Sequence, residues 1–384
     1  MRYSSRIQWD VNQNRLSMAL NHKRASNNRI LDLTESNPTA AGFLYPQEKI
    51  LNAFGDKRTL VYQPTPQGLE EARSAVSGYY GGSVPIERIL LTASTSEAYS
   101  YAFKLLCDPG DQVLVPRPSY PLFDYLAALE GVNVAQYELH YDGRWTLDIE
   151  ALRDAITPRT RALIFVNPNN PTGSFLKQSE HRVIVAICRE HSLAIICDEV
   201  FADYGFEKDA DRMQTLTGTT DVLTLCFSGL SKICGLPQMK LGWIAVSGPT
   251  VEACEAMERL ELIADTFLSV TTPVQYAAPA LLALREEIQT QICGRTKRNL
   301  AHLRSKTAET AFRVLHVEAG WYATIQVPRI RSEEDWVLNL LDRHNVLVQP
   351  GFFYDFDREA FLVLSLLTPE AVFEEGVDKL CSTE

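Results

Sequence analysis

Short, nearly continuous apolar runs alternate with stretches of helical periodicity from about residue 47 onward. Continuous apolar runs are typical of strands covered on both faces of a sheet. We predict such strands at Arg88–Thr92, Gln112–Pro116, Arg161–Val166, Leu193–Cys197, Val222–Ser228 and Leu241–Val246. We predict helices between them at Glu97–Cys107, Pro121–Glu130, Leu147–Ala155 and Gln178–His191. This alternation predicts an α/β domain in which helices sandwich a mostly parallel sheet.

The pattern changes toward the C-terminus. A long helical stretch at Ala277–Ala311 precedes isolated strands at Tyr322–Val327, Val346–Gln349 and Ala360–Ser365, and a closing helix at Pro369–Cys381. These elements predict a smaller α+β domain, which we expect the N-terminal segment Ile30–Leu33 to join. We therefore expect a large domain at residues 46–285 and a small domain built from residues 1–45 and 286–384.

Composition excludes several classes of protein. The chain has 384 residues, of which 46% are hydrophobic, so it can bury a large core. A net charge of -11 argues against a nucleic-acid partner. No apolar stretch is long enough to span a membrane, and the first five residues lack the apolar core of a signal peptide. The eight cysteines form no CxxC pair, and Cys197 and Cys226 lie in apolar runs, which favours buried thiols in a reducing cytoplasm. The seven histidines show no metal-ligand spacing, so we expect no metal.

Three polar residues each follow a predicted strand by a few positions: Asn170, Asp198 and Lys232. Ligands of open α/β sheets bind beyond the carboxyl ends of the strands, so we expect these side chains to open onto one side. An amide, a carboxylate and a lysine in this arrangement suit pyridoxal phosphate (PLP). The lysine forms a Schiff base with the aldehyde, the carboxylate keeps the pyridine nitrogen protonated, and the amide donates to the ring oxygen.

Each of these residues also has an ordinary interpretation. Asn167–Gly173, with two Asn-Pro steps, is by itself a turn sequence. A buried Asp198 needs a partner, which a protonated pyridinium or a separate basic residue would equally provide. The two interpretations of Asp198 stay open at this point.

A second group of residues is suited to a phosphate. Ser94, Thr95 and Ser96 lie between a strand and a helix, where free backbone N–H groups form an anion site. The same residues also fit the commoner arrangement, an N-cap at Ser94 with Glu97 completing a capping box. Lys240 is either a point charge for the phosphate or a surface lysine. Tyr120 is either a ring that stacks on the cofactor or a packing residue.

Five motifs in order carry a resemblance: Ser94-Thr95-Ser96, Pro118-Ser119-Tyr120-Pro121, Asn170-Pro171-Thr172-Gly173, Asp198-Glu199-Val200 and Ser231-Lys232. The chain resembles the class I/II aminotransferases of the aspartate aminotransferase fold, PLP fold type I. The resemblance runs from Asp32–Pro38 to the last helix. It implies a large domain with a seven-stranded type of sheet and a smaller α+β domain.

The resemblance also implies a role for each motif residue. Lys232 is the Schiff-base and proton-shuttling lysine, Asp198 pairs with the pyridine nitrogen, and Asn170 contacts the ring oxygen. Tyr120 stacks on the ring. The phosphate is held by Ser94, Thr95, Ser96, Ser231 and Lys240. Tyr62 is similar to a tyrosine that reaches the phosphate of the partner subunit, which implies a homodimer with shared sites. Ser36 and Asn170 are the implied substrate-binding residues.

Three positions depart from the family pattern. Phe201 stands where the family usually has a tyrosine that donates to the ring oxygen. Lys240 replaces an arginine, which keeps the charge and loses the planar fork. Val363 stands where an arginine usually clamps the α-carboxylate of the substrate in a bidentate pair. Either another residue provides that anchor, or the substrate does not present a carboxylate there.

The resemblance favours a PLP-dependent aminotransferase that moves an amino group between an amino acid or amine and a 2-oxo acid. The alternative is a PLP-dependent lyase or a cyclising amino-acid synthase on the same fold, which the missing arginine keeps open. A PLP-sensing regulator is a third interpretation. The acidic charge disfavours it, and so does the start of the family-like sequence near residue 30, which leaves no room for a DNA-binding module.

Overall fold

The structure is a computed structural model that describes residues 1, 3–7 and 12–383. The N-terminal part of the expected small domain includes residues 2 and 8–11, and its C-terminal part includes residue 384. These positions lie outside the described residues.

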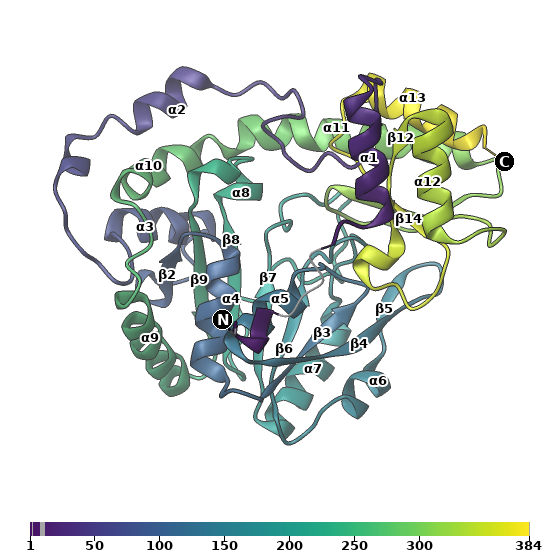
Figure 1. Ribbon diagram of the computed structural model, residues 1–384. Helices are drawn as coiled ribbons and strands as arrows, with labels where there is room; N and C mark the ends of the chain where they lie inside the picture. The colour runs from purple at the N-terminus through teal and green to yellow at the C-terminus, as the bar shows by residue number, and fades with distance from the viewer. Residues whose placement is uncertain (2, 8–11, 384) are drawn as a thin grey trace.

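An eight-stranded sheet forms the centre of the larger part of the molecule (Figure 1). Its strand order is β2-β9-β8-β7-β6-β3-β4-β5. The strands are β2 Ile89–Thr92, β3 Gln112–Arg117, β4 Asn133–Tyr141, β5 Trp145–Leu147, β6 Thr160–Val166, β7 Ala194–Asp198, β8 Thr224–Gly229 and β9 Gly242–Ser247. All neighbouring pairs are parallel except those that involve β9 and β5. The predicted mostly parallel α/β sheet is confirmed.

Helices cover both faces of this sheet. Alternate residues of each strand point to opposite sides, so the buried strands present an apolar face to the helices on either side. In β7, Ile195 and Cys197 belong to one apolar cluster, and Ala194 and Ile196 to the other. The first cluster includes residues of α2 Gln47–Ala53, α3 Glu70–Tyr79, α6 Ile149–Asp154, α7 Gln178–His191, α8 Leu230–Ile233 and α10 Thr272–Ala283. The second includes residues of α4 Thr95–Leu106, α5 Phe123–Glu130 and α9 Thr250–Asp265.

The edge hairpin β4–β5 was not predicted. Its residues alternate between exposed and partly buried positions, so they lack the continuous apolar character of the inner strands. The helix predicted at Leu147–Ala155 is correspondingly shorter, because β5 ends at Leu147 and α6 begins at Ile149. The single helical stretch predicted at Ala277–Ala311 is two helices, α10 and α11 Arg285–Thr307, which meet at Leu284.

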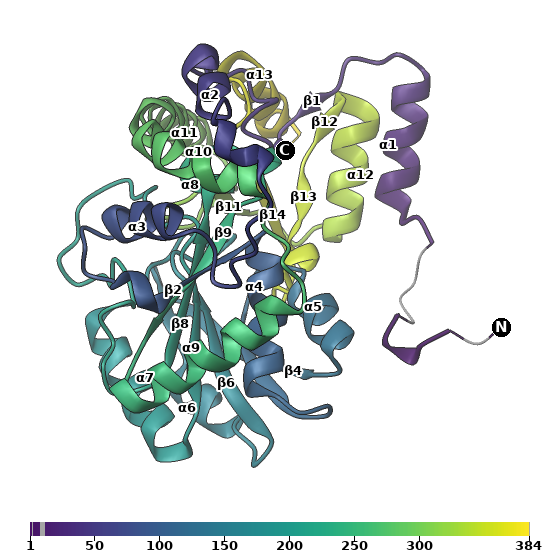
Figure 2. The same cartoon turned by 90° about the vertical axis from the view of Figure 1, so that its left-hand side faces the viewer.

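A smaller body combines the two ends of the chain (Figure 2). It contains α1 Arg15–Ala25, α12 Glu333–His344, α13 Glu370–Cys381, β1 Leu31–Asp32, β10 Arg313–Val314, β11 Tyr322–Gln326, β12 Val346–Leu347, β13 Gln349–Pro350 and β14 Phe361–Ser365. β1 pairs in parallel with β12, and one apolar cluster joins Leu31 and Leu33 to Trp336 and Leu364. In both views α1 lies beside α12, and Figure 1 shows α11 running from the side of α10 toward α13. The exact domain boundaries stay a prediction.

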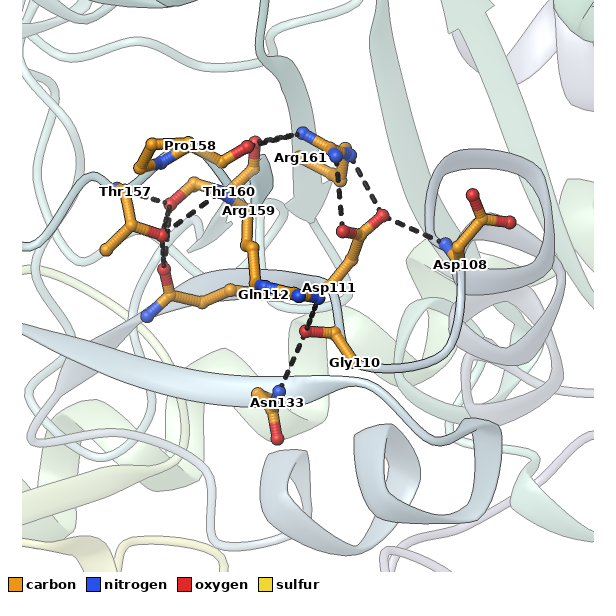
Figure 3. Close-up of polar contacts among 10 residues, drawn as sticks. All are labelled: Asp108, Gly110, Asp111, Gln112, Asn133, Thr157, Pro158, Arg159, Thr160 and Arg161. Carbon is orange, nitrogen blue, oxygen red and sulfur yellow. Dashed lines mark hydrogen bonds and ion pairs between the residues drawn. The ribbon is translucent and has the colours of Figure 1, made fainter.

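A polar network holds the amino ends of β3 and β6, at the edge of the sheet away from the predicted site (Figure 3). The Arg161 guanidinium donates to both carboxylate oxygens of Asp111, at 2.9 and 3.1 Å. The Gln112 side-chain oxygen accepts from the hydroxyls of Thr157 and Thr160, both at 2.8 Å. These contacts join the loop before β6 to the start of β3. Among the described helices, none is long and apolar enough to cross a membrane.

Candidate active site

The three predicted strand-end residues come from three adjacent parallel strands. Asp198 is the last residue of β7, and the sheet register places it opposite Val166 of β6 and Phe227 of β8. Asn170 lies in the turn after β6, and Lys232 lies on α8 directly after β8. The carboxyl ends of these strands share one edge of the sheet, which brings the three residues to the same side.

Asp198 is a buried carboxyl group, 8% exposed. Burial raises its pKa from 3.8 to about 6, although the Val200 backbone N–H, the Lys232 charge and the Tyr99 hydroxyl all oppose this shift. The Val200 N–H donates at 3.1 Å, and the Tyr99 hydroxyl lies 3.4 Å from the other oxygen. Among the described residues we find no salt bridge to Asp198. The charge of Lys232 acts on Asp198 without a salt bridge between them, which favours a cationic ligand as the partner of this carboxylate.

The Lys232 side chain lies beside two aromatic rings, and its charge interacts with that of Asp198. Its Nζ is 5.0 Å from the centroid of the Trp321 ring and 5.7 Å from that of Phe201. Burial lowers the pKa of the Lys232 amine, and the charge of Asp198 opposes that shift. A lysine with a lowered pKa is more often neutral, and the neutral amine is the nucleophile that attacks an aldehyde.

Asn170 is buried, and its side-chain oxygen finds no hydrogen-bond partner among the described residues. The turn around it is held firmly. The Asn169 amide donates to the Pro118 carbonyl at 3.0 Å and to the Thr172 hydroxyl at 2.9 Å. A buried amide oxygen without a partner in an otherwise satisfied turn is an acceptor left available to a ligand, whereas the NH2 group of the same amide is the one that could donate to a ring oxygen.

The suggested phosphate-binding segments meet at the neighbouring strand ends. The antiparallel start of β9 lies between the ends of β2 and β8, with Gly242 opposite both Thr92 and Gly229. A Cβ at Gly242 would lie 3.1 Å from the Ser94 carbonyl carbon, which shows how closely the segments approach. This register gathers the segments that carry Ser94, Thr95, Ser96, Ser231 and Lys240 at one edge.

Within this group, Ser94 is also the N-cap of α4. Its hydroxyl accepts from the Glu97 N–H at 3.2 Å, and Glu97 accepts from the Ala93 N–H at 2.6 Å. The predicted N-cap at Ser94 is therefore confirmed, whereas the capping box is not formed, because Glu97 accepts from the N–H of Ala93 and not from that of Ser94. The cap leaves the Ser94 hydroxyl proton free to donate. Lys240 is exposed with a left-handed backbone, at φ 52°. Its ammonium group has no ion-pair partner among the described residues.

Two further residues of the site were not predicted. Ser228, at the end of β8, is fully buried, and its hydroxyl has no partner among the described residues. Tyr99 lies on α4, and its hydroxyl donates to the Asp198 carboxylate. The motif Ser228–Lys232 contained a signal for the first, whereas nothing in the sequence pairs Tyr99 with Asp198.

The remaining predicted residues take different positions. Tyr120 is 36% exposed, and its pKa is raised by burial and then by the charge of Asp198, which places it near that carboxylate. Ser36 lies near the Tyr322 hydroxyl, whose pKa burial raises to about 12 while Ser36 opposes that shift. Tyr62 is 77% exposed and lines a surface pocket with Gly68, Leu91 and Tyr101. Neither Lys232 nor Asp198 lines that pocket.

The two hydrophobic departures belong to different apolar clusters. Phe201 packs edge-on against Trp321, with ring centroids 5.2 Å apart. Val363 is 1% exposed and lies opposite Thr324 of β11 and Gln349 of β13. It clusters with Tyr354 and Phe361, and the Tyr354 hydroxyl donates to the Gln349 side chain. The neighbours of Val363 in this cluster are neutral side chains.

These residues fit PLP. Asn170 and Ser228 offer buried polar groups without partners, Asp198 has no salt bridge within the described residues, and Lys232 has a lowered pKa. A pyridine nitrogen beside Asp198, an aldehyde at Lys232 and a phosphate at the start of α4 would match the chemistry of each group. Among the described residues, no cluster of His, Cys, Asp or Glu could hold a metal ion.

The chain is similar to known proteins over most of its length. The model of the family "Aminotransferase class I and II" matches residues 28–380. The chain is 32% identical to the glutamate-pyruvate aminotransferase AlaA of Escherichia coli K12 over 259 residues, which cover 66% of this chain and 64% of that protein. The match thus spans less than two thirds of that relative. Identity to the Haemophilus influenzae AlaA is 27% over 366 residues, covering 92% of this chain and 90% of that protein.

Solved structures share the whole fold. The alanine aminotransferase from Pyrococcus furiosus matches with a TM-score of 0.89 and 25% identity, and covers 99% of each chain. A Thermus thermophilus aspartate aminotransferase mutant matches with a TM-score of 0.83 and 22% identity over 100% of each chain, which shows the fold. The family match covers most of the chain, from before β1 into α13, and on this basis the chain belongs to the class I and II aminotransferases.

Proposed function

We propose that this chain is a PLP-dependent aminotransferase that transfers an amino group from an amino acid or amine to a 2-oxo acid. The observation that carries the proposal is the convergence of Asn170, Asp198 and Lys232 at the ends of three adjacent strands. The relatives named above are all named as aminotransferases, which supports transamination over elimination.

In this proposal each residue performs one task. PLP supplies an electron sink for the bonds at the amino-bearing carbon when it is bound. Asp198 holds the proton on the pyridine nitrogen, and Asn170 donates to the ring oxygen. Lys232 would hold the aldehyde group of the cofactor, and its free amine would take a proton from the substrate α-carbon as a base and give it back as an acid. Tyr120 packs against the ring, and Ser36 and Asn170 contact the substrate.

The phosphate is held by hydroxyls and backbone N–H groups of Ser94, Thr95 and Ser96, with Ser231 and the charge of Lys240. The N-terminus of α4 contributes its positive end to this set. Lys240 acts as a point charge, because it lacks the planar fork of an arginine.

The assembly in this proposal is a homodimer with shared sites. Its support is the exposed segment Leu60, Val61 and Tyr62, in which the side chains are 86%, 64% and 77% exposed. Such a contiguous apolar segment marks an interaction surface. We also propose a reducing, cytoplasmic location, which the buried free thiols of Cys188, Cys197, Cys226 and Cys234 support.

A single-turnover screen of amino acids and amines against the PLP-loaded protein tests the proposed function. Conversion of the cofactor to pyridoxamine phosphate is the expected result. Release of ammonia or pyruvate with the cofactor unchanged would instead establish a lyase. The Lys232→Ala variant is the control, since it should lose the visible absorbance of the lysine-bound cofactor while its thermal unfolding is retained.

A further inference from the structure

The segment that carries Lys232 is a very short helix. α8 has four residues, Leu230–Ile233, so most of its carbonyl groups lack partners within the helix. Such a helix contributes little stability of its own, because the conformational entropy lost in forming the first turn exceeds what its hydrogen bonds offset. The position of Lys232 therefore depends on contacts from elsewhere in the chain.

Three side chains from other elements donate to the carbonyls of this segment. The Tyr204 hydroxyl donates to the Lys232 carbonyl at 2.5 Å. The Gln289 amide, from α11, donates to the Ile233 carbonyl at 2.9 Å. The Tyr45 hydroxyl donates to the Gly235 carbonyl at 2.7 Å. The backbone around Lys232 is thus held by residues up to 190 positions away in the sequence.

A second layer holds Gln289. Its amide also donates to Asp203 at 2.6 Å, and the Tyr79 hydroxyl of α3 donates to the other Asp203 oxygen at 3.1 Å. Burial raises the pKa of Asp203, whereas these two hydrogen bonds and the Arg285 charge lower it. Asp203 therefore links Tyr79 of α3 to Gln289 of α11, and Gln289 in turn donates to the Ile233 carbonyl.

We propose that Tyr204 and Gln289, with Asp203 orienting Gln289, are positioning residues for Lys232. This inference rests on the proposed role of Lys232 as the lysine that carries PLP. These side chains act through backbone carbonyls rather than on the cofactor. They set where the ε-amine lies relative to Asp198, and misplacement of a reacting group by about 1 Å is enough to cost about 100-fold in rate.

Gln289→Leu is the main test, and Gln291→Leu is its matched control. Gln291 lies on the same helix, where it bonds only to the Leu44 backbone and to its own helix. The first readout is the rate at which cofactor-free protein takes up PLP. The Lys232 amine condenses with the aldehyde and releases water, and borohydride trapping followed by mass spectrometry locates the product. We expect Gln289→Leu to lower this rate and kcat by about 10- to 100-fold, with KM nearly unchanged. Gln291→Leu should match wild type.

Two further variants separate positioning from folding. Tyr204→Phe removes only one hydroxyl and should lower kcat in the same direction as Gln289→Leu. Asp203→Asn keeps an acceptor for Gln289 and can turn its amide toward the Tyr79 oxygen, so it should rescue most of the loss seen in Asp203→Leu. A merely structural role would instead make kcat follow the melting temperature across all these variants.

A cofactor-independent measurement distinguishes the two proposals. Competitive acetylation of the cofactor-free protein reports the pH at which Lys232 becomes reactive. We expect this midpoint to rise in Gln289→Leu, because a displaced amine is less buried. Equal midpoints and equal uptake rates in folded Gln289→Leu would overturn the positioning role. Failure of wild type to attach PLP at Lys232 would overturn the proposed function, whatever the midpoints show.

Discussion

At the scale of single residues, burial works against the charge of Asp198. Its pKa is about 6 with no cation bound to it, so the site without a ligand is poised between the neutral and charged carboxyl forms. A protonated nitrogen next to this group would favour the charged form and lower the pKa again. Burial without a salt bridge thus suits a carboxylate whose partner is a cationic ligand.

Asp198→Ala should therefore lower turnover by several orders of magnitude, with a smaller effect on cofactor occupancy. Without the carboxylate the ring nitrogen loses its proton and is a poor electron sink. The measurements are kcat and the visible absorbance of the loaded protein. Glu199→Gln, a change at the neighbouring buried carboxyl, is the control and should retain turnover. Near-normal kcat in Asp198→Ala would exclude a mechanism assisted by the ring nitrogen.

Val363→Arg tests how the substrate carboxylate is bound. Val363 itself carries no charge and packs in an apolar cluster beside Gln349, so it cannot pair with a carboxylate. A new guanidinium should raise kcat/KM for alanine or glutamate and lower it for the substrate that wild type prefers. A close charge pair of this kind contributes about 2 to 4 kcal/mol, which corresponds to about 30- to 1000-fold.

The measurement is kcat/KM for a panel of amino acids and amines. Val363→Met, which adds length without charge, controls for crowding in this buried position. If wild type already uses alanine or glutamate efficiently and Val363→Arg leaves the panel unchanged, Val363 does not face the substrate.

At the scale of elements, Glu199 pins the end of β7 to a distant loop. Its carboxyl group accepts from the Leu216 N–H at 2.7 Å and from the Thr215 hydroxyl at 2.8 Å. Burial raises its pKa from 4.5 to about 7, although these hydrogen bonds oppose the shift. The strand that ends in Asp198 is therefore anchored by a carboxyl group that titrates near neutral pH.

This anchor predicts a pH dependence of stability. A carboxyl whose pKa is higher in the folded than in the unfolded protein binds its proton more tightly when folded. The contribution of Glu199 to the free energy of unfolding is therefore greatest below pH 4.5 and is lost as the pH rises through about 7. Within that window the free energy of unfolding falls by about 1.4 kcal/mol per pH unit from this group.

Glu199→Gln keeps an acceptor for the Leu216 N–H and does not titrate, so its stability should fall less between pH 5 and pH 7 than that of wild type. Urea unfolding of the cofactor-free proteins at several pH values measures this difference. The exposed Glu255→Gln change is the control. Parallel curves for wild type and Glu199→Gln would show that Glu199 does not change protonation in this range.

At the scale of the whole molecule, a proposed homodimer accounts for the position of Tyr62. The residue is exposed, follows the exposed Leu60 and Val61, and lines a pocket that contains neither Lys232 nor Asp198. In a symmetric dimer, one chain can contribute Tyr62 to the site that contains Lys232 of its partner. The site described above would then be completed only on assembly.

Hybrid dimers test this arrangement. Lys232→Ala and Tyr62→Ala dimers should each have low activity. After the two are unfolded together and refolded, random assortment should produce about a quarter of the sites with both wild-type residues. We expect kcat per site to recover to about that fraction. Activity no higher than the mean of the two parents would show that Tyr62 does not act across the interface.

Most of the parallel sheet and the order of the site residues could be predicted from the sequence. Continuous apolar runs mark strands buried on both faces, and a polar residue just after such a run has to lie at the carboxyl edge of the sheet. Asn170, Asp198 and Lys232 were found in this way. The hairpin β4–β5 was missed because its strands are partly exposed and their pattern is mixed.

The sequence by itself determined which residues follow the buried strands, since an apolar run and the polar residue after it are local features of the chain. Only the tertiary structure decided what holds those residues in place. Tyr204 and Gln289 reach the Lys232 segment, and Tyr99 reaches Asp198, across long sequence separations. Periodicity contains no signal for such pairs, because they form only when helices and strands pack and leave a buried carbonyl or carboxylate in need of a donor.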